Sequence, residues 1–131
     1  MFGKEEEGKF EETPALRAAA RAFRAMTQEK DWSKTSAGYH EAYQLCGSST
    51  VPELALRGEV CMWYGFALKN LFGLESISDR RPPTQEQLKA VAQIKGLWTE
   101  MLGIDSRLPY ESHRLDSRIV EQIRSHWIMP E

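Results

Sequence analysis

Three arginines in the first third of the chain are spaced so that they share one face of a helix. Arg17, Arg21 and Arg24 stand four and three residues apart, which stacks their side chains over successive turns. Guanidinium groups match phosphate oxygens in a bidentate geometry, so this stripe is a candidate contact for a nucleic-acid backbone. The alternative, which the sequence favours, is a solvated helix face paired with the acidic N-terminus, because charged stripes are normal on amphipathic helices.

The histidines and cysteines do not form a metal-binding pattern. None of His40, His113 and His126 has the spacing of a known site such as H-E-x-x-H. Cys46 and Cys61 lack the C-x-x-C spacing of zinc sites, and both lie among apolar residues. We therefore expect free thiols that pack as small hydrophobic side chains, with no metal and no cofactor.

Arg118, Arg124 and His126 lie in the last expected helix and raise the possibility of catalysis. The combination resembles compact helical ribonucleases of the HEPN type, in which a His follows an Arg within a few residues. Here seven residues separate Arg118 from His126 and one separates Arg124 from it, so the spacing differs. Because the chain also lacks a nucleophile elbow and a glycine-rich phosphate loop, we expect a non-enzymatic protein. A compact helical RNase is kept as an alternative.

The segment from Thr50 to Gly73 is the strongest helix signal and is apolar on nearly every side. Thr50 and Glu53 match a capping box, Pro52 suits the first turn, and Gly73 can adopt the left-handed conformation that ends a helix. Such a helix is either buried by other helices or spans a membrane. Its charged residues leave fewer than the roughly 20 apolar residues that a span needs, so we expect it to be the central helix of a helical domain.

Start and stop signals predict four further helices around this one. They are expected at residues 13–28, 36–46, 84–102 and 112–127. The first begins at Thr13 and has an apolar line formed by Leu16, Ala19, Ala20, Phe23 and Met26. The fourth element begins with a capping box at Thr84 and Gln87 and ends at Gly103. We therefore predict a single all-α domain of about five helices over residues 13–131, preceded by a short flexible acidic arm at residues 1–12.

Composition and charge are those of an ordinary globular domain. The 131 residues are 41% hydrophobic and 27% charged, with a formal net charge of −2. This balance provides no overall basic field, so nucleic-acid binding would depend on a local patch. The acidic N-terminus has no long apolar run, so we expect no signal peptide, no membrane association and a cytoplasmic location.

Trp127, Ile128 and Met129 are the residues that we expect at a protein interface. They place three large apolar side chains at the end of the last helix, where a small domain has little surface to cover them. Trp and Met are enriched in protein interfaces. The sequence therefore favours a helical binding or assembly protein that acts through self-association or a protein partner.

The segment from Leu54 to Leu108 resembles the helical hairpin of some phage small terminase subunits. In that family two apolar helices flank a polar loop, and the second ends in a Leu-Gly-hydrophobic turn followed by a polar run containing Arg. Residues 101–107 read Met-Leu-Gly-Ile-Asp-Ser-Arg and match this turn. The resemblance implies an oligomeric ring that binds phage DNA, so a nucleic-acid-binding oligomer is the alternative function.

Overall fold

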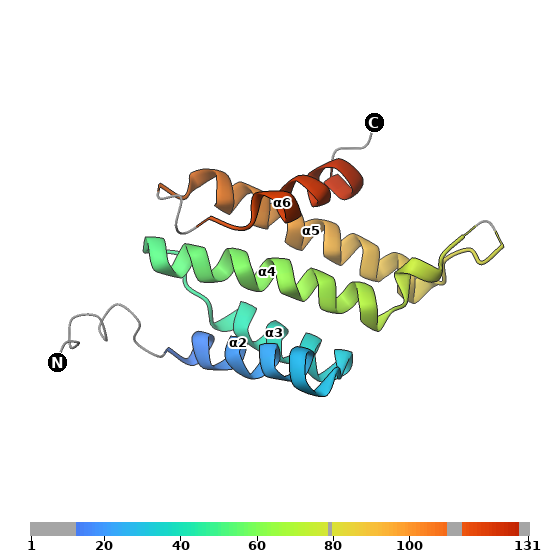
Figure 1. The fold of residues 1–131 in the computed structure, drawn as a ribbon, viewed down its shortest axis with the longest axis horizontal. Helices are drawn as coiled ribbons and strands as arrows, with labels where there is room; N and C mark the ends of the chain where they lie inside the picture. Colours follow the sequence, from blue (N-terminus) through green and yellow to red (C-terminus); the bar gives the residue numbers. More distant parts are fainter. Residues whose placement is uncertain (1–12, 79, 110–113, 129–131) are drawn as a thin grey trace.

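A computed structural model describes residues 13–78, 80–109 and 114–128, and all regular structure within them is helical (Figure 1). The α-helices are α2 (Pro14–Arg24), α3 (Trp32–Leu45), α4 (Val51–Leu71), α5 (Gln85–Arg107) and α6 (Ser117–Ile123). Shorter turns are the π-helical η1 (Ala25–Glu29) and η4 (Arg124–Ile128) and the 3₁₀-helical η2 (Leu74–Ser76). The predicted all-α fold is confirmed for this part of the chain. The expected acidic arm at residues 1–12 lies outside the described residues.

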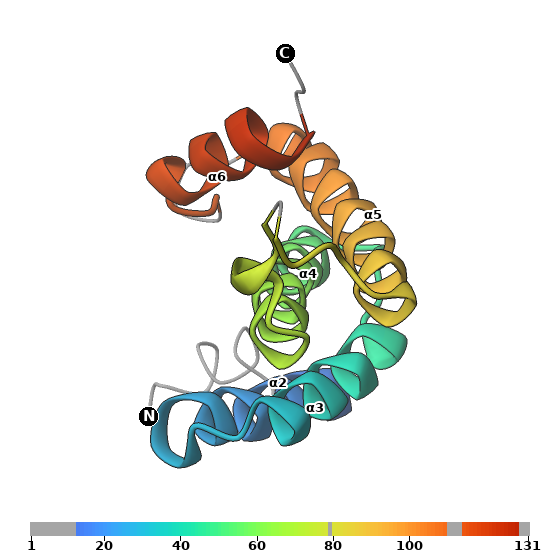
Figure 2. The same cartoon turned by 90° about the vertical axis from the view of Figure 1, so that its right-hand side faces the viewer.

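Helix α4 is the central element, as predicted. Seen end-on, it lies inside an arc formed by α2 and α3, then α5, then α6 (Figure 2). The most extensive contacts join α2 to α3, α3 to α4 and α4 to α5, while η4 contacts α5. The largest fully buried side chains come mainly from α4 and α5, and include Val60, Cys61, Ile94, Trp98, Met101 and Ile104.

The ends of α4 form as its sequence predicts. The Glu53 N–H donates to Thr50 Oγ1 at 3.2 Å, and Glu53 Oε1 accepts from the Thr50 N–H at 3.1 Å, which completes the capping box. Gly73 has a φ of 59°, the left-handed conformation that a glycine adopts without a steric penalty. Local chemistry therefore determines both ends of the central helix.

Helix α5 is longer than predicted, because Gly103 does not end it. The capping box of Thr84 and Gln87 forms, but the helix continues through Gly103 to Arg107. Ile104 is 1% exposed, and burying such a side chain gains about 1.5–3 kcal/mol, more than the roughly 1 kcal/mol that an internal glycine loses. Residues 101–107, which were compared with the turn of a small terminase subunit, are therefore helical. This part of the resemblance to that family is not present in the structure.

The buried face of α2 is made of small residues rather than of its larger apolar side chains. The buried residues of α2 and η1 are Ala15, Ala18, Ala22, Ala25 and Met26. Of the predicted apolar line, only Met26 is buried, and the part from Leu16 to Phe23 is half-buried or exposed, so this line does not form the buried face of the helix. The alanines let α3 approach closely: an added Cβ at Gly38 would lie 2.8 Å from the Ala22 Cβ.

Helix α3 begins one turn before the predicted start at Ser36. Asp31 caps it, with Oδ1 accepting from the Lys34 N–H at 3.0 Å. The cap lacks the reciprocal half of a capping box, since Lys34 occupies the position where Glu or Gln would reach back. A single Asp is a weaker start signal than the paired residues that begin α4 and α5.

Helix α6 begins at Ser117, later than the predicted residue 112. Asp116 Oδ1 accepts from the Arg118 N–H at 2.8 Å and caps the helix. Just before it, the Leu115 N–H donates to Asp105 Oδ1 at 2.9 Å, which ties this segment to the end of α5. Residues 110–113, which include His113, lie outside the described residues.

Candidate functional site

An open groove of about 380 Å³ lies between α2 and α4, with α3 at its base. Its walls are Leu16, Ala19, Ala20 and Phe23 from α2, Tyr39 from α3, and Leu56, Glu59, Val60 and Trp63 from α4. The part of the predicted apolar line from Leu16 to Phe23 is thus one wall of the groove. Phe23 keeps 47% of its surface exposed there. We call this feature the α2–α4 groove.

A series of aromatic rings continues from the α2–α4 groove along α4 to the C-terminal helix. Phe23 meets Trp63 edge-on at 6.3 Å between centroids, and Trp63 lies 5.9 Å from Phe66. Phe66 lies 5.0 Å from Trp98, which meets Trp127 edge-on at 4.9 Å. Pairs at these distances add about 0.5–1.5 kcal/mol each beyond their burial. The series thus runs from the partly exposed aromatic surface of the groove, at Phe23 and Trp63, into the core, where Trp98 is fully buried.

Two polar groups interrupt the apolar lining of the groove. Tyr39 is 2% exposed, and burial, with a contribution from the charge of Glu59, raises the pKa of its hydroxyl. Glu59 is exposed over much of its surface, yet loss of hydration on the groove side raises the pKa of its carboxyl. Within the described residues, neither group takes part in a hydrogen bond or an ion pair.

A second cavity, of about 400 Å³, lies between α3, α4 and α5, and several polar side chains line it. The Gln93 side-chain amide donates to the Tyr64 hydroxyl oxygen at 3.1 Å, and the same hydroxyl lies 2.9 Å from His40 Nδ1. The amide N–H can only donate, so the Tyr64 hydroxyl oxygen accepts from Gln93, and its proton can be donated to His40 Nδ1 in the tautomer that carries the imidazole proton on Nε2.

A carboxylate at the edge of the same cavity ties the three helices together. Tyr43 donates its hydroxyl to Glu100 Oε1 at 2.7 Å, and Arg57 Nε forms a short ion pair with Glu100 Oε2. The Arg57 guanidinium also lies 4.4 Å above the Tyr43 ring. Desolvation acts to raise the pKa of Glu100, but these hydrogen bonds together hold it below its usual value. An ionised, fully paired carboxylate suits structural support better than proton transfer.

Sequence reasoning did not find these cavities. The residues that meet at Tyr64 are 24 and 29 positions away from it, and Tyr43 and Glu100 are 57 apart. No local spacing signals such pairs, since they come together only when three helices pack. The sequence signals only the capping residues that define where those helices begin, and not the contacts between them.

The arginine stripe is on the surface of α2, as the sequence predicts. Arg17, Arg21 and Arg24 are all exposed. Arg21 lies 3.5 Å from Glu41 of α3, and both side chains are more than half exposed. An exposed pair of this kind contributes about 0–1 kcal/mol, so it neither stabilises the fold strongly nor fixes the stripe in place.

The C-terminal residues proposed for an interface are only partly within the described chain. Trp127 is half-buried, and its edge-on contact with Trp98 places much of the ring against the core of its own chain. The side chain of Ile128 and the whole of Met129 lie outside the part that the structure describes. Their place at an interface stays a prediction.

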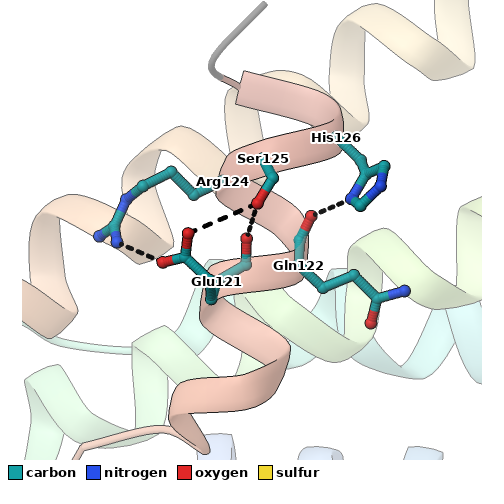
Figure 3. Close-up of polar contacts among 5 residues, drawn as sticks. All are labelled: Glu121, Gln122, Arg124, Ser125 and His126. Carbon is teal, nitrogen blue, oxygen red and sulfur yellow. Dashed lines mark hydrogen bonds and ion pairs between the residues drawn. The ribbon is translucent and has the colours of Figure 1, made fainter.

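Of the residues considered for a ribonuclease, Arg124 and His126 make local contacts within the last helix (Figure 3). His126 Nδ1 lies 3.1 Å from the Gln122 carbonyl oxygen, which can only accept, so Nδ1 carries the proton. Arg124 pairs with Glu121 at 3.2 Å and points to the other side of the helix, as Figure 3 shows. Arg118 pairs with Asp116 at 3.5 Å. Arg124 and His126 therefore do not converge in the described chain.

The described residues contain no group of three His, Cys, Asp or Glu side chains placed to hold a metal ion. Among the helices that the structure describes, none is both long enough and apolar enough to cross a membrane. Comparisons with protein-family models, curated proteins and solved structures give no match to this chain. The geometry of the α2–α4 groove is consequently the main guide to function.

Proposed function

We propose that this chain is a non-enzymatic binding protein whose α2–α4 groove receives an apolar helical segment of a partner protein. One observation carries the proposal: α2 packs against α3 through alanines and leaves its larger apolar side chains, above all Phe23, lining an open groove. Grooves with an apolar aromatic lining are a recurrent way of binding amphipathic helices.

The dimensions of the groove suit a short helix. The α4 residues that line its length, from Leu56 to Trp63, extend over about 10 Å at 1.5 Å per residue, which matches roughly two helical turns of a partner. Phe66 extends the aromatic surface by almost another turn. Covering a large apolar side chain gains about 1.5–3 kcal/mol, so two or three anchors supply enough energy for specific binding.

The test compares two substitutions of equally exposed apolar residues. Phe23→Ser removes the groove anchor, and Leu88→Ser is its matched control, because Leu88 is 48% exposed on α5 and does not line the groove. Proteins that crosslink to the wild-type chain in a lysate of the source organism are identified and purified. Each is then titrated by calorimetry against wild type, Phe23→Ser and Leu88→Ser.

We expect Phe23→Ser to weaken the binding of the purified partner at least about tenfold, equivalent to 1.4 kcal/mol, and Leu88→Ser to leave it unchanged. Native mass spectrometry of the chain alone shows whether a second copy occupies the groove instead. A chain that stays monomeric and has no partner sensitive to Phe23 contradicts the proposal.

A further inference from the structure

Glu59 and Tyr39 are the polar groups of a groove whose remaining walls are apolar or aromatic. Among the described residues, neither has a hydrogen bond or an ion pair, although Tyr39 is 2% exposed. Buried polar groups normally have hydrogen-bond partners, and one without a partner destabilises the folded state. The arginine nearest to Glu59 along α4, Arg57, is held by Glu100 in the contacts between α4 and α5.

We propose that the partner segment bound in the α2–α4 groove inserts a lysine or arginine side chain that pairs with Glu59 beside Phe23 and Trp63. This inference rests on the proposed function and names the chemistry of its occupant. The groove thus recognises an amphipathic helix with a single cation among its apolar residues, rather than a wholly apolar one.

The charge of Glu59 decides between the possible occupants. In the free protein, water reaches the carboxylate from the open side of the groove. A wholly apolar helix would displace that water and leave the carboxylate buried without a partner, a loss of several kcal/mol. An acidic helix would add repulsion. A cation replaces the water with an ion pair, which becomes stronger as the groove closes.

The aromatic walls favour the same occupant. Trp63 and Phe23 meet edge-on at 6.3 Å, and both line the same groove as Glu59. A cation is attracted to the face of an aromatic ring, so rings beside a carboxylate add to its preference for a cation. A lysine ammonium has three N–H donors, and the Glu59 carboxylate and the Tyr39 hydroxyl oxygen are acceptors for them. One cationic side chain therefore pairs with Glu59 and offers a donor to the Tyr39 hydroxyl oxygen.

The cation site is tested first with small probes that need no known partner. Benzylammonium and n-butylguanidinium are titrated into the full chain, with benzyl alcohol and n-butylurea as neutral counterparts, while the NMR signals of Trp63 and Phe23 are followed. We expect the cations to bind roughly tenfold more tightly than the neutral probes. Glu59→Gln removes this preference, and Glu41→Gln, which changes an exposed carboxylate of α3 outside the groove, retains it.

A helical peptide then separates a protein side chain from a free organic cation. The peptide carries leucines on one face and one central lysine, and its counterpart has norleucine at that position. Tighter binding of the lysine peptide by wild type, lost in Glu59→Gln, supports the proposal. Small cations that bind while the lysine peptide does not would overturn it in favour of a free amine.

Equal binding of cationic and neutral probes would also overturn the cation inference, and so would the absence of binding by every probe. Neither result touches the proposed function, which depends on the loss of partner binding in Phe23→Ser. If Phe23→Ser leaves partner binding unchanged while the small cationic probes still bind wild type more tightly than Glu59→Gln, the proposed function fails. The occupant of the groove is then a small molecule.

Discussion

The indole of Trp98 occupies the space that the missing side chain of Gly65 leaves on α4. Any Cβ at Gly65 would overlap the indole nitrogen, and that nitrogen donates a hydrogen bond to the Met62 carbonyl at 3.1 Å. Trp98 is fully buried and contacts Phe66 and Trp127. The close approach of α4 and α5 therefore depends on a glycine in the middle of the most apolar helix.

Gly65→Ala is expected to destabilise the protein by about 1–3 kcal/mol, because the indole must move out of a packed core and lose its hydrogen bond. Gly103→Ala is the matched control. It lies in α5 with no atom within 4 Å of the added Cβ, so it should stabilise by about 0.4–1 kcal/mol. Urea denaturation followed by circular dichroism measures both. A neutral Gly65→Ala would contradict the packing described here.

Glu59→Gln should stabilise the free protein at neutral pH. Desolvation raises the pKa of Glu59 in the folded state, so folding works against its ionised form at every pH above that pKa. Below pH 4.5, the usual pKa of a Glu carboxyl, Glu59 is protonated in both the folded and the unfolded state. The stability gained by the substitution therefore disappears there. Unfolding free energies of the two chains at pH 4 and pH 7 provide the test, and a variant less stable at pH 7 would refute this reasoning.

Glu100→Gln should have the opposite dependence on pH. The folded-state pKa of Glu100 is lowered, so its contribution to stability is complete above the usual value of 4.5 and is lost as the pH falls through the lowered pKa. Wild type should therefore exceed the variant in stability most at neutral pH, with a difference that shrinks on acidification. Tyr43→Phe removes one hydrogen bond to the Glu100 carboxylate and should therefore reduce part of this pH-dependent difference in stability. A difference that grows on acidification would contradict the assignment.

The triple substitution of Arg17, Arg21 and Arg24 by Ala should leave folding and groove binding unchanged, since all three side chains are exposed. A gel-shift titration against duplex DNA tests the alternative function. Three phosphate contacts would give a logarithmic salt slope of roughly three. Wild-type binding with that slope, lost in the triple variant, would show that the stripe binds phosphate and is more than a solvated face.

The sequence predicts helices best where two local signals coincide. Thr50 with Glu53, and Thr84 with Gln87, begin α4 and α5 where expected. Gly103 was wrong as a stop because burial of Ile104, a tertiary effect, outweighs the propensity of glycine. Alanines form the buried face of α2, and the apolar line predicted for this helix, apart from Met26, lines the groove instead.

The candidate site was less predictable than the fold. Its α2 wall was identified as an apolar line, but only the position of α4 shows that it borders a groove with Glu59 and Trp63. Tyr39 and Glu59 belong to different helices, and their lack of hydrogen-bond and ion-pair partners among the described residues is a property of how those helices pack. No spacing in the sequence signals an unsatisfied group.

The major helix contacts join elements that follow one another along the chain, α2 with α3, α3 with α4, and α4 with α5. Few distant segments must therefore find each other before favourable contacts form, so the loop-closure entropy of the transition state is small. Helical proteins of this kind fold on a time scale of about microseconds to milliseconds. Since α2 is attached mainly through α3, it can open locally while α3, α4 and α5 stay packed. Amide hydrogens of α2 should accordingly exchange sooner than those of α4 and α5.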